Sequence, residues 1–194
     1  MAPSIEDAKA VIRREAQARR DALPADLRAA AAQTIAARPF PVALAPGGIV
    51  SGFMPVKSEI NPVPLMRALA AAGARLALPA VARRGKPLVM RAFAFGEALA
   101  PGVWGIREPK PDAPEVFPDV VLVPLLAFAR SGHRIGYGAG YYDMTVTALR
   151  AKKTVLAVGI AFAAQEIPSV PTTPRDARLD LVLTEREVID CRTN

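Results

Sequence analysis

The sequence contains one cysteine and one histidine, and this scarcity excludes whole classes of functional site. Cys191 is the only cysteine in the 194 residues, so no disulfide can form within the chain. Zinc sites built from cysteine and histidine need several such ligands, which His133 and Cys191 alone cannot supply. A nucleophilic mechanism with a histidine base would have to use His133. We therefore expect any chemistry to depend on lysine, arginine, carboxylates, backbone N–H groups and a bound cofactor or metal.

Long apolar runs and aromatic residues are also scarce. No stretch approaches the ~18 consecutive apolar residues of a membrane-spanning helix. Residues 1–7 are polar and acidic, unlike a signal peptide, so we expect a cytoplasmic protein with no membrane partner. Aromatic residues make up 6% of the chain, which leaves few platforms for stacking nucleic-acid bases.

Positive charge is in excess. Lysine and arginine total 25 against 18 aspartate and glutamate residues, which gives a formal net charge of +7. Such a charge suits an anionic partner. A basic nucleic-acid-binding module therefore stays open as an alternative, although the cations are spread along the chain rather than clustered.

Apolar periodicity and helix breakers predict helices that alternate with strands. Helical spacing covers residues 5–23, 26–38, 62–72 and 141–150. Short apolar runs predict strands at residues 49–54, 75–78, 88–95, 120–123, 154–160 and 179–183. The alternation predicts an open, mostly parallel α/β sheet flanked by helices, in a single domain over residues 1–194. We expect loops at residues 96–118 and 124–140, and the length of the first suggests a binding role.

Residues 134–143, Arg-Ile-Gly-Tyr-Gly-Ala-Gly-Tyr-Tyr-Asp, form the most informative segment. Glycines at every second position, ahead of an expected helix, let the backbone approach a ligand, and successive N–H groups at a helix N-terminus bind phosphate. The spacing matches neither the P-loop nor the dinucleotide-binding fingerprint, so a tight connection without a ligand is equally compatible. Asp143 at the end of the segment stands where a magnesium ligand is wanted beside a phosphate, or it favours the helix dipole.

A stripe of basic residues runs along the first expected helix. Lys9 and Arg13 are four residues apart and therefore project from the same face, and Gln17 and Arg20 extend the stripe. An isolated stripe of this kind is usually a solvated face. Together with Arg134 and the glycine-rich segment, it becomes a candidate clamp for phosphate groups. Each charge-assisted hydrogen bond to phosphate contributes roughly 1.5–3 kcal/mol.

Residues 134–143, with Pro-Leu-Leu-Ala-Phe at 124–128 before them, resemble the 5-formyltetrahydrofolate cyclo-ligase family. The similarity covers nearly the whole chain and includes Lys9 and Arg13, residues 54–59, the segment Trp-Gly-Ile-Arg-Glu-Pro at 104–109, residues 158–161, Gln165, Asp176 and residues 179–180. The chain departs from the family pattern at several positions. This chain has Ala129, Ala139, Met144 and Asn61 at positions where the family usually has Asp, Gly, Arg and Asp, respectively. These departures concern substrate preference and rate rather than the class of reaction.

The resemblance implies a three-layer sandwich like that of sugar-phosphate isomerases and CoA transferases. It also implies ATP- and Mg²⁺-dependent cyclisation of 5-formyltetrahydrofolate to 5,10-methenyltetrahydrofolate. The γ-phosphoryl group moves to the formyl oxygen, N10 attacks the activated carbon, and ADP and phosphate are released. The expected partner is the folate, with or without extra glutamates. We also expect the protein to be a monomer and to bind no nucleic acid. A sugar-phosphate isomerase that binds phosphate without hydrolysing ATP stays open as an alternative.

The resemblance also assigns residues to roles. Lys9 and Arg134 are the catalytic candidates, and Asp143 and Asp176 are the magnesium candidates, with Asp180 in reserve. The ATP site would comprise Lys9, Arg13, Arg134, Gly136, Tyr137, Gly138, Ala139, Gly140, Tyr141 and Tyr142. A carboxylate suits the adjacent N–H donors of a pterin, and apolar or aromatic side chains suit its flat ring. The folate site would therefore comprise Met54, Glu59, Trp104, Tyr137 and Tyr141.

Overall fold

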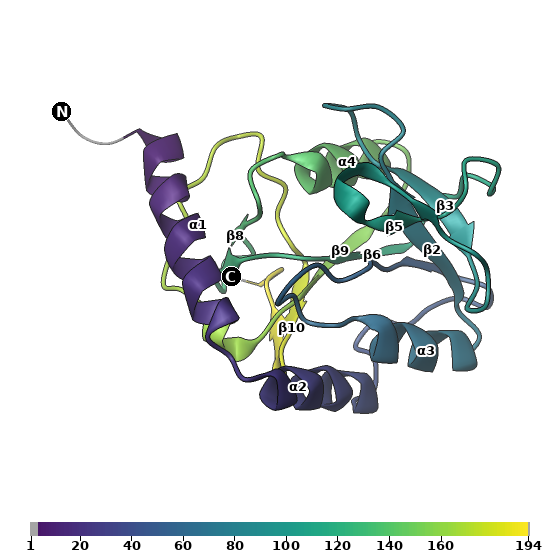
Figure 1. Ribbon diagram of the computed structural model, residues 1–194, viewed down its shortest axis with the longest axis horizontal. Helices are drawn as coiled ribbons and strands as arrows, with labels where there is room; N and C mark the ends of the chain where they lie inside the picture. The colour runs from purple at the N-terminus through teal and green to yellow at the C-terminus, as the bar shows by residue number, and fades with distance from the viewer. Residues whose placement is uncertain (1–3, 194) are drawn as a thin grey trace.

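The computed structural model describes residues 4–193, and a seven-stranded sheet forms its centre (Figure 1). The strands of this sheet are β1 (Ile49–Ser51), β2 (Arg75–Ala80), β3 (Val89–Phe93), β6 (Val120–Val123), β9 (Leu156–Ile160), β10 (Leu181–Leu183) and β11 (Val188–Asp190). Their order across the sheet is β11-β10-β9-β6-β1-β2-β3. The inner strands run parallel, and the two edge strands, β3 and β11, run antiparallel to their neighbours. The predicted mostly parallel α/β sheet is confirmed.

Helices cover both faces of the sheet, which makes three layers. Strand β6 reads Val-Val-Leu-Val and is buried on both sides, as is typical of a central parallel strand. Val120 and Leu122 pack into one core with helices α2 (Ala25–Ala37) and α3 (Val63–Ala71). Val121 and Val123 point to the opposite core, which helix α4 (Tyr141–Arg150) covers. Figure 1 accordingly shows α2 and α3 below the sheet and α4 above it.

Helix α1 (Ile5–Asp21) lies apart from both helical layers, along one side of the molecule (Figure 1). The Ser4 side chain caps it by accepting a hydrogen bond from the Asp7 N–H, and the Asp7 carboxylate accepts one from the Ser4 N–H in return. Ile12 and Ala16 pack on the short hairpin formed by β7 (Ala127–Phe128) and β8 (Arg134–Ile135). This contact holds the basic stripe of α1 beside the glycine-rich segment that follows β8.

Both expected loops contain regular structure, so those two predictions are wrong in detail. Residues 96–118 include strands β4 (Ala100–Pro101) and β5 (Arg107–Glu108) and the short helix η1 (Val103–Gly105). Residues 124–140 contain the β7–β8 hairpin, and η2 (Ala163–Gln165) and the edge strand β11 were also not predicted. Elements of two or three residues are too short to produce a hydrophobic period, so no sequence pattern marks them.

The strand order opens a crevice between β1 and β6. The chain passes from β1 through α3 to β2 on one side, and from β6 through α4 to β9 on the other. In open α/β sheets, ligands bind at the carboxyl ends of the strands where the connections diverge in this way. Residues 52–59 leave the carboxyl end of β1, and residues 124–140 leave that of β6, so the fold brings these segments together.

Candidate active site

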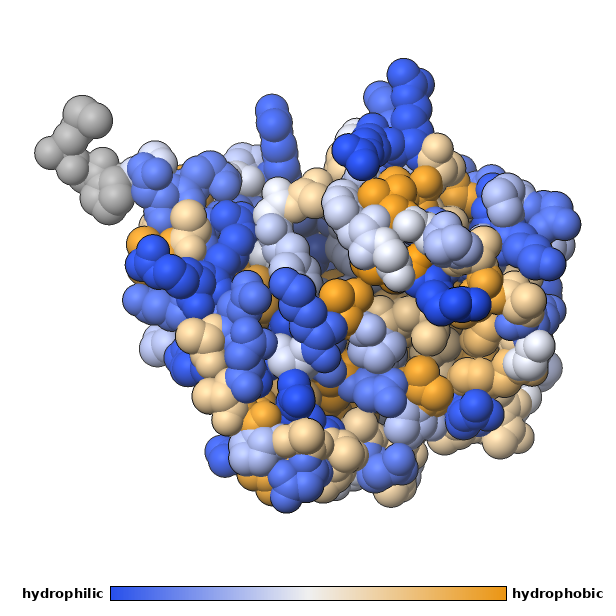
Figure 2. All heavy atoms as spheres, viewed as in Figure 1, coloured by the Kyte–Doolittle hydropathy of each residue, from blue (hydrophilic) through white to orange (hydrophobic). Residues whose placement is uncertain are grey.

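A cavity of about 810 Å³ lies at this crevice. All the residues assigned above to catalysis, ATP, folate or magnesium lie on its wall, apart from the reserve residue Asp180. Figure 2 shows the surface hollowed between α1 and α4. Helix α1 and the glycine-rich segment give the wall cations and backbone N–H groups, which we call the cationic end. Residues 53–59 and the β2–β5 region give it mainly apolar side chains together with Glu59 and Glu108, which we call the apolar end. A site of this size and mixed character is typical of a small-molecule pocket.

Helix α1 contributes the first cations. The Lys9 side chain is only 7% exposed, and its Nζ donates to both carboxylate oxygens of Asp176, at 2.9 and 2.7 Å. Arg13 donates from Nε to the Gly136 carbonyl at 3.2 Å, and its guanidinium lies directly against Gly138. Both side chains therefore reach the same cavity from one face of α1, the common face that the helical spacing predicted, and Arg13 contacts the glycine-rich segment.

The basic stripe expected on α1 does not reach the cavity as far as Arg20. Its side chain is 1% exposed and does not lie on the cavity wall, so it is not placed to clamp phosphate. It points behind the wall instead, where it donates to Ser58 Oγ at 3.0 Å and to Tyr137 Oη at 2.6 Å. The stripe thus reaches the cavity only through its first two cations.

The glycine-rich segment presents its backbone to the cavity. Gly138 and Gly140 have φ values of 100° and 67°, which glycine adopts without strain, whereas Ala139 keeps an ordinary negative φ. Ala139 therefore fits the backbone conformation where the family usually has glycine. No acceptor lies within hydrogen-bond reach of the Gly138, Ala139 or Gly140 N–H groups in residues 4–193, and α4 begins without a side-chain cap. These donors are available to an anion.

The carboxylates at this end are already paired with cations. Asp143 Oδ1 accepts from Arg134 at 2.9 Å and from the Ala177 N–H at 3.0 Å. Burial raises the pKa of Asp176, but hydrogen bonds from Lys9 and Thr173 outweigh burial and hold that pKa below its usual value. Asp180 lies off the cavity and accepts from Arg150 and from the Ala157 N–H, which removes it as a reserve magnesium ligand.

The donor set at this end fits a nucleotide-bound magnesium ion better than a dedicated metal cage. Within residues 4–193, no group of three or more histidine, cysteine or acidic side chains is arranged to hold a metal. Magnesium on a nucleotide needs only one or two protein carboxylates, because phosphates and water complete its shell. Asp143 Oδ2 accepts no hydrogen bond from the described chain, whereas Lys9 and Thr173 occupy both oxygens of Asp176. Asp143 is therefore the better ligand of the two.

The other end of the cavity joins a carboxylate to an apolar wall. Glu59 Oε2 accepts from the Val56 N–H at 2.8 Å, and burial raises the pKa of this carboxyl group. Burial, together with the nearby Glu59 charge, also raises the pKa of Tyr137 to about 12. Met54 lies on the cavity wall in the same segment as Glu59, and Tyr142 packs onto the core beneath the cavity.

Trp104 forms an exposed part of the rim. Its side chain is 62% exposed, and its ring meets the Tyr141 ring edge to face at a centroid distance of 5.7 Å. Its φ of 59° is unusual for a residue other than glycine and marks strain of the kind that gathers at ligand sites. The short β4–β5 pairing on either side holds it in place.

Four charged residues of the wall have no role predicted from the sequence: Glu6, Lys57, Glu108 and Arg175. Glu108 lies in the segment 104–109 and accepts from the Val81 N–H at 3.3 Å, and Arg175 is exposed at the cationic end. Glu108 lies in the segment 104–109 that resembles the family, and this resemblance could have indicated a role for it. Arg175 is a lone charge in a proline-rich loop, and nothing in the sequence distinguishes it.

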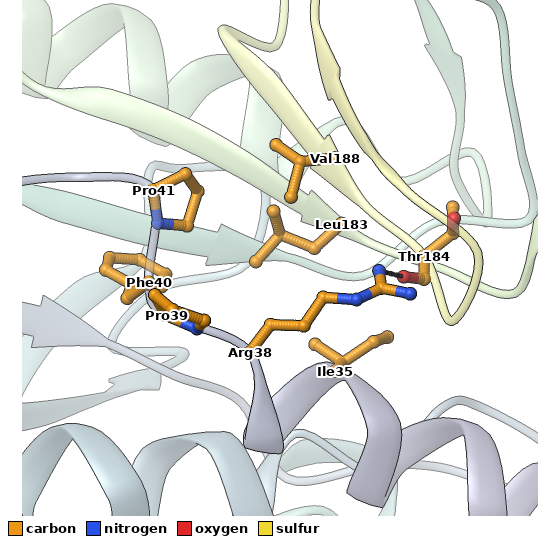
Figure 3. A pocket seen from close by; sticks show the side chains of 8 residues that line it. All are labelled: Ile35, Arg38, Pro39, Phe40, Pro41, Leu183, Thr184 and Val188. Atoms are coloured by element: carbon orange, nitrogen blue, oxygen red, sulfur yellow. Dashed lines mark hydrogen bonds between the residues drawn. The ribbon is translucent and has the colours of Figure 1, made fainter.

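A second hollow lies at the end of α2 and is too small for a ligand. It holds about 10 Å³, the limit for a single water molecule. Figure 3 shows Arg38 reaching across it to Thr184, where the guanidinium donates to the Thr184 carbonyl at 2.6 Å. Arg38 also donates to the Glu185 carbonyl, so this hollow is where α2 is fixed to the turn between β10 and β11.

Among residues 4–193, no helix is both long and apolar enough for a membrane span.

Comparisons with known proteins agree with the resemblance seen in the sequence. The chain is 34% identical over 151 residues to the 5-formyltetrahydrofolate cyclo-ligase of Mycolicibacterium smegmatis, covering 74% of this chain and 76% of that protein. Identity to the enzyme of the same name from Escherichia coli strain K12 is 33% over 145 residues, or 72% of this chain and 79% of that protein. The solved structure of Aquifex aeolicus 5,10-methenyltetrahydrofolate synthetase has a TM-score of 0.79 at 25% identity and covers 95% of this chain and 93% of that one. Residues 5–185 match the 5-formyltetrahydrofolate cyclo-ligase family as a whole, so this chain belongs to that family of ligases.

Proposed function

We propose that this chain closes the ring of 5-formyltetrahydrofolate to give 5,10-methenyltetrahydrofolate, with Mg-ATP as the second substrate and ADP and phosphate as products. One observation carries the proposal: the wall of a single cavity combines cations and free backbone N–H groups with apolar side chains and the buried Glu59 carboxylate. Family membership supports the folate substrate, and the cations and free N–H groups support the triphosphate. No specific observation favours nucleic-acid binding or sugar-phosphate isomerisation.

The reaction needs phosphate because a formyl oxygen is a poor leaving group. Transfer of the γ-phosphoryl group to that oxygen releases ADP, and attack by N10 on the formyl carbon then expels the oxygen as phosphate. Enzymatic phosphoryl transfer depends mainly on positioning and on charge neutralisation. Lys9, Arg13 and Arg134 would neutralise the phosphates, and the N–H groups of residues 138–140 would orient them. Asp143 would hold the magnesium ion, which withdraws charge from the phosphate oxygens when it is bound.

The apolar end would bind the pterin. Glu59 would accept two adjacent N–H groups of the ring, since a carboxylate presents two oxygens at a matching spacing. Met54, Trp104 and Tyr141 would line the faces of the ring. We propose that the protein acts as a monomer and in the cytoplasm.

The anionic tail of the folate would lie at the turn between β2 and β3. Arg83, Arg84 and Lys86 are exposed in this turn, and none of them pairs with an acidic residue among residues 4–193. The Gly85 N–H donates to Tyr141 Oη at 3.4 Å, and residues flanking the turn line the cavity. The turn therefore places three unpaired cations beside the mouth of the site.

Replacing Arg83, Arg84 and Lys86 together with alanine should raise KM for a pentaglutamate substrate about tenfold, because each exposed ion pair contributes roughly 0.2–1 kcal/mol. KM for the monoglutamate should change much less. Steady-state rates with the two substrates measure the difference. A matched variant replaces three exposed cations that lie off the cavity wall, Arg14, Arg19 and Lys110. It should retain the wild-type ratio of KM for the pentaglutamate to KM for the monoglutamate. An unchanged ratio in the first variant would remove the turn from the site.

The activity itself is tested by incubating the folded protein with 5-formyltetrahydrofolate and Mg-ATP and following the absorbance of 5,10-methenyltetrahydrofolate. The proposal predicts product formation that requires both ATP and a divalent ion, with one ADP released per turnover. Absence of product across the pH range in which the protein is folded would refute it. Product formation without ATP would mean that the formyl oxygen leaves as water, which would contradict the phosphoryl-transfer step.

A further inference from the structure

Arg20 is the most deeply buried cation of the described chain and has no part in the reaction as proposed above. Its guanidinium is satisfied in three directions, by Ser58 Oγ at 3.0 Å, Tyr137 Oη at 2.6 Å and the Leu125 carbonyl at 3.5 Å. Ser58 in turn donates to Asp21. Burying a cation costs free energy unless the cation is paired or fully hydrogen-bonded. An apolar residue could fill the same space without that cost, so packing alone does not explain an arginine here.

The side-chain partners of Arg20 come from two segments that are far apart in the sequence. Tyr137 lies between Gly136 and Gly138 in the glycine-rich segment, the proposed nucleotide side. Ser58 precedes Glu59 in the segment that leaves β1, the proposed folate side. The Tyr137 hydroxyl accepts a hydrogen bond from Arg20, and Tyr137 and Glu59 lie close enough for each to influence the pKa of the other. The Arg20 charge also acts on Glu59.

We propose that Arg20 is a positioning residue that holds Tyr137 and Glu59 as one unit and so couples folate binding to nucleotide binding. The inference rests on the proposed function. A folate that bonds Glu59 fixes the segment that carries Ser58. The hydrogen bonds of Arg20 to Ser58 and Tyr137 pass this restraint to the glycine-rich segment, which is ordered before the nucleotide arrives. The nucleotide then meets a cradle that needs less ordering, so its affinity rises. Linkage requires the nucleotide to raise folate affinity by the same factor.

Calorimetry tests the coupling directly. The dissociation constant of a non-hydrolysable Mg-ATP analogue is measured with and without saturating 5-formyltetrahydrofolate, and the ratio of the two constants is the coupling factor. We expect about fivefold or more in the wild-type protein, in the usual range for coupled sites. The factor should fall to about one in Tyr137→Phe, which keeps the ring and removes the hydroxyl. It should also fall in Arg20→Lys, because an ammonium cannot reproduce the guanidinium fork.

Arg19→Lys serves as the matched control, because Arg19 is the exposed neighbour of Arg20 on α1 and lies off the cavity. It should keep the wild-type factor. Thermal unfolding identifies any variant that fails to fold. If Arg20→Lys does not fold, Tyr137→Phe still decides the question, because Tyr137 is 48% exposed on a loop and its replacement should leave the fold intact. A wild-type factor of one, or an unchanged factor in Tyr137→Phe, overturns the inference while the activity stands. A wild-type protein that binds neither ligand overturns the proposed function and the inference together.

Discussion

Replacing Lys9 with methionine should lower kcat/KM for ATP by about 10- to 100-fold, because a charge-assisted hydrogen bond to phosphate contributes roughly 1.5–3 kcal/mol and each 1.36 kcal/mol changes a rate tenfold. Lys9 is well placed for this role, since its ammonium group is buried at the cationic end and is held by Asp176. Methionine preserves the length and apolar stem of the side chain. Initial rates over a range of ATP concentrations, at saturating folate, give the loss.

Two further variants separate the phosphate role of Lys9 from its ion pair. Lys110→Met, at an exposed lysine off the cavity wall, should behave as wild type. The double variant Lys9→Met/Asp176→Asn removes both members of the pair and leaves no uncompensated charge. If Lys9 served only to neutralise Asp176, the double variant would recover wild-type kinetics. Our account predicts that it stays as slow as Lys9→Met.

Glu59→Gln should lower kcat/KM for 5-formyltetrahydrofolate by about 10- to 100-fold, since one charged acceptor for the pterin is lost. The same residue predicts a pH dependence. Burial raises the pKa of the Glu59 carboxyl above its ordinary value of 4.5, so lowering the pH neutralises this group before an ordinary glutamate would titrate. The wild-type kcat/KM for the folate should therefore fall on the acid side, with a midpoint above 4.5.

The pH–rate profile of Glu59→Gln provides the check on that assignment. An amide does not titrate, so the acid limb due to Glu59 should be missing from the variant, and the remaining rate should be flat in that range. The exposed residue Glu97 offers a matched control, and Glu97→Gln should retain both the rate and the limb. An acid limb that survives in Glu59→Gln would assign the titration to another group.

Local patterns predicted the parts of this molecule that depend on local physics. The four-residue spacing of Lys9 and Arg13 fixed their common face, and the start of α4 at Tyr141 followed from the glycine at its N-cap. The complete burial of β6 likewise follows from its apolar run. These features depend on helix periodicity, on glycine φ angles and on burial, which neighbouring residues determine.

Features that depend on distant contacts were not predictable in this way. Nothing local places β1 beside β6, yet that neighbourhood brings Glu59 to within reach of Tyr137. Arg20 extends the same basic stripe as Arg13, but it is buried and bonds Ser58, Leu125 and Tyr137 behind the cavity wall. The pairing of β4 with β5, which carries Trp104 to the rim, is likewise too short to leave a pattern.

The most direct test of the account follows the formyl oxygen itself. The protein is given Mg-ATP and 5-formyltetrahydrofolate labelled with ¹⁸O in the formyl group, and the released phosphate is analysed by mass spectrometry. If the cavity brings the γ-phosphate to the formyl oxygen, the phosphate will carry one ¹⁸O atom per turnover. Unlabelled phosphate, formed while 5,10-methenyltetrahydrofolate accumulates, would contradict transfer of the phosphoryl group to the folate.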